Sequence, residues 1–158
     1  MQISSACNPS GMRHVYLIDT NVVSETRKKE RANPGVLRFF DRIVASGEPV
    51  HLCVVSVGEL RRGVELIRHR GDADQAKRLD TWLTTVLDQY GENILPFEAD
   101  AAQVWGRLRV PNPGNELDKQ VAATALVSDL TVVTRNTADF ESTGVKLINP
   151  FLPEILPG

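Results

Sequence analysis

Short apolar runs alternate with longer amphipathic segments along this chain. Three of the runs, VYLI at 15–18, HLCVV at 51–55 and LTVV at 130–133, have the length and composition of buried strands. ILPF at 94–97 is another short apolar run, and KLINP at 146–150 is the candidate for a last strand. The polar residues DTN follow the first run directly, which predicts a loop at the edge of a sheet.

The segments between the runs carry apolar residues at helical spacing. Asn33 and Pro34 resemble a helix cap and a first-turn proline, and apolar residues follow at intervals of three and four up to Val44. Further helices are expected from Ser56, over about 72–90, over about 98–108 and over 117–129. This order predicts a three-layer α/β/α sandwich with a mostly parallel sheet, in which ligands bind outside the carboxyl ends of the strands.

Composition fits one compact domain. The chain has 158 residues, 42% hydrophobic and 24% charged, and it lacks both a signal-peptide pattern and an apolar stretch of the roughly 20 residues that cross a membrane. We expect a flexible extension at 1–12, one domain at 13–150 and a tail at 151–158, with translation starting at Met1 or Met12. The two cysteines show no metal-ligand spacing, which favours a reducing cytoplasm.

Four acidic residues fall where this fold would bring them together. Asp19 ends the first strand, Glu59 opens the helix after the second strand, Asp118 opens the alanine-rich helix, and Asp139 follows the strand at 130–133. Carboxylates crowded at one edge repel one another, so the arrangement makes chemical sense with a hard cation among them. Mg²⁺ or Mn²⁺ is the natural candidate.

Such a cation would serve the hydrolysis of a phosphodiester. A bound divalent ion lowers the pKa of a water ligand and stabilises charge on a phosphoryl oxygen. The three histidines, His14, His51 and His69, stand without a paired serine or cysteine motif, so water attack is preferred over covalent catalysis. A formal net charge of −2 excludes wholesale coating of nucleic acid and permits a local basic patch.

Each acid also has a purely structural interpretation. Glu59 stands three residues after Ser56, in the spacing of a capping box. Asp118 suits the dipole of a helix start, Asp19 suits a turn, and Asp139 suits an ordinary loop. Only the joint pattern of the four favours a functional site.

Four sequence blocks, taken together, resemble one known family. They are LIDTNVVSE at 17–25, VGELRRGVE at 57–65, LDKQVAATAL at 117–126 and TRNTADFE at 134–141. In order and content they are similar to a PIN domain of the VapC and FitB-like toxin group, over about residues 14–150. The resemblance implies a five-stranded parallel sheet and an acidic pocket that binds Mg²⁺ or Mn²⁺ and cleaves RNA.

The resemblance also assigns site residues. Asp19, Glu59, Asp118 and Asp139 stand at the family's four acidic positions. The polar positions that line such a pocket are matched by Thr20, Asn21, Thr134 and Asn136, and Arg135 belongs to the same motif as the last two.

The same resemblance implies partners. Members of this group form homodimers and are held inactive by a cognate antitoxin, which places a C-terminal segment across the toxin's groove. Operator DNA is bound only through the antitoxin. The extension ahead of Met12 is longer than the family usually carries before its first strand.

Several basic residues near the expected pocket are candidates for contact with RNA phosphates. They are Arg27, Lys28, Arg61, Arg62 and Arg135. Solvated helix faces explain such residues equally well.

Two other functions remain open from the sequence. The chain could be a catalytically silent PIN module that acts in a repressor or scaffold complex. An aspartate after the first strand also begins phosphatase motifs of the D-x-D-x-T type, but DTNVV lacks the second aspartate.

Overall fold

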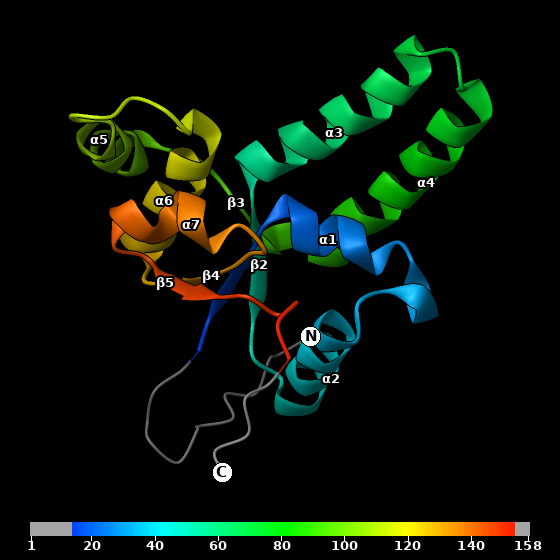
Figure 1. The fold of residues 1–158 in the computed structure, drawn as a ribbon, viewed down its shortest axis with the longest axis horizontal. Coiled ribbons are helices and arrows are strands. Elements are labelled where there is room, and N and C mark those ends of the chain that lie inside the picture. Colours follow the sequence, from blue (N-terminus) through cyan, green and yellow to red (C-terminus); the bar gives the residue numbers. More distant parts are fainter. Residues whose placement is uncertain (1–13, 154–158) are drawn as a thin grey trace.

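A five-stranded parallel sheet forms the centre of the protein (Figure 1). The computed structural model describes residues 14–153, so the expected extension at 1–12 and the choice between Met1 and Met12 lie outside the described residues. The strand order is β3-β2-β1-β4-β5, and every neighbouring pair is parallel. The strands are β1 (Tyr16–Ile18), β2 (Val50–Cys53), β3 (Ile94–Leu95), β4 (Thr131–Val133) and β5 (Lys146–Ile148).

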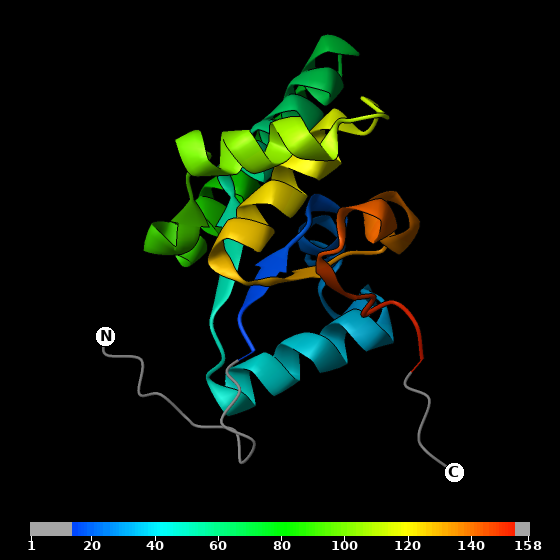
Figure 2. The ribbon, with the colours of Figure 1, turned by 90° about the vertical axis from the view of Figure 1, so that its left-hand side faces the viewer.

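Helices cover both faces of the sheet, which confirms the predicted three-layer sandwich. The longer helices are α1 (Thr20–Thr26), α2 (Pro34–Ser46), α3 (Val54–His69), α4 (Ala73–Tyr90), α5 (Ala99–Leu108) and α6 (Glu116–Ser128). The short ones are α7 (Thr137–Phe140), η1 (Lys29–Arg31), η2 (Gly91–Asn93) and η3 (Glu141–Thr143). Figure 2 shows α2 and α6 on opposite sides of the strands.

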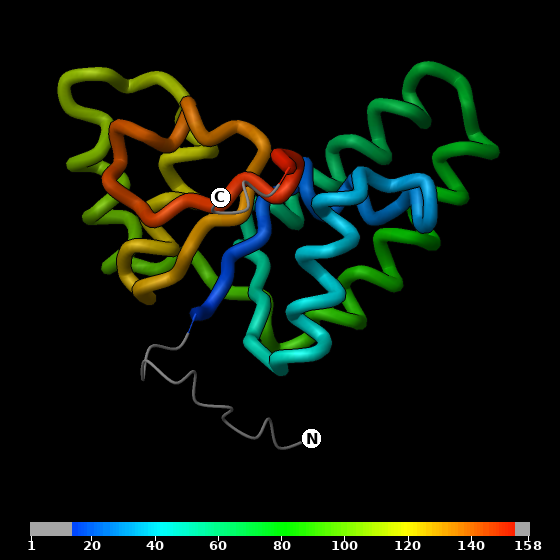
Figure 3. The backbone as a smooth tube through the Cα atoms, turned by 60° about the horizontal axis from the view of Figure 1, so that its bottom comes forward, coloured from blue at the N-terminus to red at the C-terminus, as the bar shows by residue number. Residues whose placement is uncertain are grey.

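Two hydrophobic cores result from the alternation of side chains along each strand. Tyr16 and Ile18 of β1 join the core formed with α1 to α4, whereas Leu17 between them joins the core formed with α6 and α7. In β4, Val133 and Val132 divide in the same way. Helices α3 and α4 pack as a hairpin that projects from the sheet (Figure 3).

Three local features differ from the sequence predictions. A helix, α1, begins at Thr20 where a loop was expected, because the Asp19 side chain caps it. Helix α3 begins at Val54, so the second strand ends two residues earlier than its apolar run. In α2 the buried residues are Val36, Phe39 and Ile43, and Val44 is 84% exposed. No described helix is long and apolar enough to cross a membrane.

Candidate active site

Asp19 is the most enclosed acid of the site. It follows β1 at the carboxyl edge of the sheet and is only 3% exposed. Its Oδ1 accepts a hydrogen bond from the backbone N of Thr20 at 2.8 Å. Its Oδ2 accepts bonds from Thr134 Oγ1 at 2.8 Å and from Asn21 Nδ2 at 3.1 Å. These donors hold the carboxylate in one orientation.

The same polar side chains join the ends of two neighbouring strands, β1 and β4. Asn21 accepts a hydrogen bond from the backbone N of Arg135 at 3.0 Å, and its Nδ2 lies 3.3 Å from Thr134 Oγ1. Thr134 Oγ1 also accepts from the backbone N of Asn136 at 3.0 Å. Three of the four predicted pocket residues therefore contact Asp19 through their own side chain or backbone, and Asn136 is linked to it through Thr134.

Glu59 and Asp118 are half-buried and approach Asp19 from helices α3 and α6. Burial, together with the negative charges of Asp19 and Asp118, raises the pKa of Glu59 to about 7. Burial, together with the negative charges of Asp19 and Asp139, raises the pKa of Asp118 to about 6. Electrostatic interactions thus connect all four predicted acids. One of them, Glu59, has a pKa that allows it to exchange a proton near neutral pH.

Asp139 is half-buried, like Glu59 and Asp118. It lies in the short helix α7 rather than in a loop, and its backbone N donates to Asn136 O at 3.1 Å. Its connection to the other acids runs through the charge of Asp118. Asp118 lies in the first turn of α6, where a negative charge also favours the helix dipole.

The capping-box interpretation of Glu59 is wrong. Ser56 lies inside α3, whose N-cap is Cys53. Its hydroxyl is fully buried and has no hydrogen-bond partner among residues 14–153. The spacing of Ser56 and Glu59 therefore has no capping role here. This removes the main structural explanation for Glu59.

The donor set suits a hard divalent cation. All four acids offer carboxylate oxygens, which Mg²⁺ and Mn²⁺ prefer, and a positive ion would relieve the repulsion that raises the pKa values of Glu59 and Asp118. Among residues 14–153, no group of three or more acidic, histidine or cysteine side chains lies close enough together to hold a metal ion. Mg²⁺ is commonly held by one or two carboxylates with water completing its shell, so the residues fit that mode.

The predicted basic residues have different partners. Lys28 pairs with Glu25 at 2.8 Å, and Arg61 pairs with Asp80 of α4 at 3.0 Å, so neither is directed at the acids. Arg62 is exposed on α3. Arg135, in the loop after β4, lies with its guanidinium 5.0 Å from the centre of the Phe151 ring.

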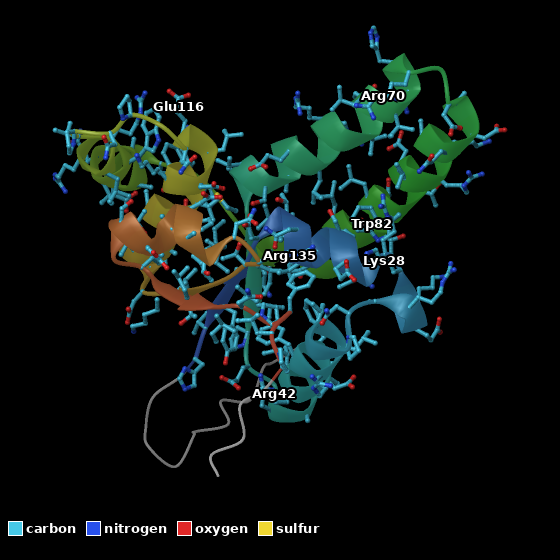
Figure 4. The ribbon with its side chains drawn as sticks, in the orientation of Figure 1. Lys28, Arg42, Arg70, Trp82, Glu116 and Arg135 are labelled. Atoms are coloured by element: carbon cyan, nitrogen blue, oxygen red, sulfur yellow. The ribbon has the colours of Figure 1, made fainter. Side chains whose placement is uncertain are left out.

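A groove beside the acids was not predicted from the sequence. It has a volume of about 300 Å³, is enclosed by α1, α3 and α4, and includes both Thr20 and Glu59 in its wall. Arg27 and Trp82 also line it, with the guanidinium 5.8 Å from the indole centre. Figure 4 shows Trp82 and Lys28 near the carboxyl end of α1. Trp82 falls in the apolar stripe of α4, so its sequence position alone indicates only core packing.

Comparison with known proteins identifies the family. A family model for the PIN domain matches residues 16–146. The chain belongs to the PIN domain family. Within this family it is 33% identical to Toxin FitB of Neisseria gonorrhoeae, over 87% of this chain and 99% of that protein. It is 31% identical to VapC ribonuclease Y4jK of Sinorhizobium fredii, over 88% of this chain and 99% of that protein.

Solved structures of PIN-domain proteins share the fold. The crystal structure of FitAcB from Neisseria gonorrhoeae superposes with a TM-score of 0.75 at 31% identity, covering 86% of this chain and 98% of that chain. The structure of FitAB bound to IR36 DNA fragment gives a TM-score of 0.75 at 30% identity, covering 88% and 97%. The five-stranded parallel sheet expected from the resemblance is therefore confirmed.

Proposed function

We propose that this PIN-domain protein is a metal-dependent ribonuclease, the toxin of a VapBC-type toxin-antitoxin pair, which hydrolyses RNA phosphodiesters with water. The observation that carries the proposal is the set of four interacting carboxylates at the carboxyl edge of the sheet, with the pKa of Glu59 raised to about 7. The similarity to Toxin FitB and to VapC ribonuclease Y4jK supports the same activity.

The acids have distinct parts in this proposal. Asp19, held by Thr20, Asn21 and Thr134, is the fixed metal ligand, and Asp118, Glu59 and Asp139 complete the acidic pocket. When bound, Mg²⁺ or Mn²⁺ supplies charge stabilisation at the phosphoryl group and a more acidic water. Glu59 is the proposed acceptor of the proton from the attacking water, because its half-buried carboxylate interacts with Asp19 and Asp118 in the pocket.

The proposed partners follow from the relatives. The solved structure of FitAB bound to a DNA fragment supports a cognate antitoxin for this chain and contact with operator DNA through that antitoxin. A homodimer is the proposed assembly of the toxin. Exposed apolar side chains on α6, among them Leu117 and Val127, are available to such an interface.

The direct test is cleavage of labelled RNA by the purified protein. Wild-type protein is expected to cleave in Mg²⁺, and EDTA is expected to abolish the cleavage. Asp118→Asn is expected to lower the rate by at least about a hundredfold and to weaken Mg²⁺ binding while the melting temperature stays near that of the wild type. Glu116→Gln, in the same helical turn, is the matched control and should keep full activity. Cleavage that survives EDTA or Asp118→Asn would contradict the proposal and favour a silent module with a contaminating nuclease.

A further inference from the structure

Arg135 is fixed at three points although its side chain is exposed. Its backbone N donates to Asn21 Oδ1 at 3.0 Å, which ties it to the residue that orients Asp19. Its backbone O accepts from Asn149 Nδ2 at 3.4 Å. Its guanidinium lies 5.0 Å from the centre of the Phe151 ring, within the range of a cation–π interaction. Figure 4 shows Arg135 beside α1, at the centre of the molecule.

The turn that holds Arg135 is itself firmly packed. Phe151 packs against the core shared by α1 to α4, and its backbone N donates to Asn149 Oδ1 at 3.0 Å. Gly35, in the first turn of α2, lies so close to this turn that a Cβ there would be 2.0 Å from the carbonyl oxygen of Pro150. The turn at 149–151 is therefore a fixed support for Arg135, although the sequence placed its last residue in a tail.

The positive charge of Arg135 is not neutralised by the four acids of the pocket. Among residues 14–153, no carboxylate forms an ion pair with Arg135. Arg135 does help to lower the pKa of Glu25, whose carboxylate is already paired with Lys28.

We propose that Arg135 binds a phosphate of the RNA strand next to the cleaved one, and that Phe151 and Asn149 are positioning residues for it. A ring face attracts a guanidinium without neutralising it, so the N–H groups stay available for a phosphate. The contacts with Phe151 and Asn149 also keep the Arg135 guanidinium from pairing with the carboxylates of the acidic pocket. This inference rests on the proposed function, because it assumes an RNA substrate.

Binding without cleavage tests the first half of the inference. The Asp19→Asn protein and a fluorescein-labelled single-stranded oligouridylate of about 12 nucleotides are titrated by fluorescence anisotropy at several KCl concentrations. Adding Arg135→Ala is expected to weaken binding about tenfold, the size of one charged hydrogen-bonded contact. The slope of log K against log [KCl] is expected to fall by about 0.7, the value for one phosphate on a single strand.

Two matched variants make this result specific. Arg70→Ala removes the same charge at the tip of the α3–α4 hairpin, far from the site in Figure 4, and should leave the affinity and the slope unchanged. Arg135→Lys keeps the charge and should keep most of the slope. An unchanged affinity and slope in Arg135→Ala would overturn the assignment. If wild-type protein still cleaved RNA in that case, this inference alone would fail and the proposed function would stand.

A double-mutant cycle tests the positioning role. Phe151→Leu is expected to weaken RNA binding severalfold when Arg135 is present and to have no effect in the Arg135→Ala protein. Phe151→Tyr keeps the ring and should restore binding. Gly35→Ala displaces the turn from its other side and should act like Phe151→Leu. Equal effects of Phe151→Leu with and without Arg135 would show that the ring only stabilises the fold, and would overturn the positioning role.

Discussion

Asp19 combines a structural and a chemical role in one side chain. Its Oδ1 caps the start of α1, and the same carboxylate is the buried acid at the centre of the site. Thr134 and Asn21 donate to its other oxygen, so the orientation of the acid depends on the ends of β1 and β4 being adjacent. Asp19 is therefore a helix cap rather than a turn residue, and its role as a metal ligand stays a prediction.

Glu59 makes the stability of the metal-free protein depend on pH. Its pKa is 4.5 ordinarily and about 7 in the folded protein, so between these values the folded state binds more protons than the unfolded state. Its contribution to stability is therefore lost as the pH rises from about 4.5 through 7. Glu59→Gln does not titrate, so in EDTA its melting temperature is expected to rise relative to that of the wild type across this window.

A second glutamate on α3 is the control for this pH dependence. The hydrogen bond from Arg68 lowers the pKa of Glu65, the opposite direction from Glu59. Glu65→Gln should therefore show no relative gain in melting temperature between pH 4.5 and 7. A constant difference between Glu59→Gln and wild type over that range would contradict the electrostatic account of the pocket.

At the scale of elements, the sequence predicted which segments form strands and helices better than where they begin. Strand β1 and the cap of α2 by Asn33 were found because an apolar run and an Asn-Pro pair are local signals. Val54 and Val55 were assigned to a strand because β-branched residues favour strands, but tertiary packing places them in α3. Helix α1 was missed because its cap and first two residues, DTN, have the composition of a turn.

Helix α4 holds the α3–α4 hairpin to the sheet through its buried stripe. Leu83 of α4 is 0% exposed and belongs to the core that includes residues of β1 and α3. Leu83→Ala is expected to lower the free energy of urea unfolding by about 2–5 kcal/mol, the range for a buried leucine that leaves a cavity. Val44→Ala, at an 84% exposed position of α2, should change it by less than about 0.5 kcal/mol. A loss at Leu83 no larger than at Val44 would contradict the described packing.

At the scale of the whole molecule, the parallel sheet explains why four distant acids were predictable together. Asp19 follows β1 directly, whereas Glu59, Asp118 and Asp139 lie in the first two turns of α3, α6 and α7. In a parallel sheet the carboxyl ends of the strands meet at one edge. The groove lined by Trp82 and the support of Arg135 by Phe151 were not predictable. The groove depends on contacts between α1 and α4, and the support of Arg135 depends on contacts between the loop after β4 and the turn at 149–151. No spacing in the sequence indicates either set of contacts.

The most direct test of the central claim is induction of wild type and of Asp19→Asn in bacterial cells, with growth and total RNA followed together. Asp19→Asn keeps the size of the side chain and one of its two acceptor oxygens while removing the charge, so the soluble amounts of both proteins are compared first. The account predicts growth arrest and discrete RNA cleavage with the wild type alone. Equal growth and intact RNA with both proteins, at equal soluble expression, would contradict a metal-dependent ribonuclease and favour a PIN module that only binds.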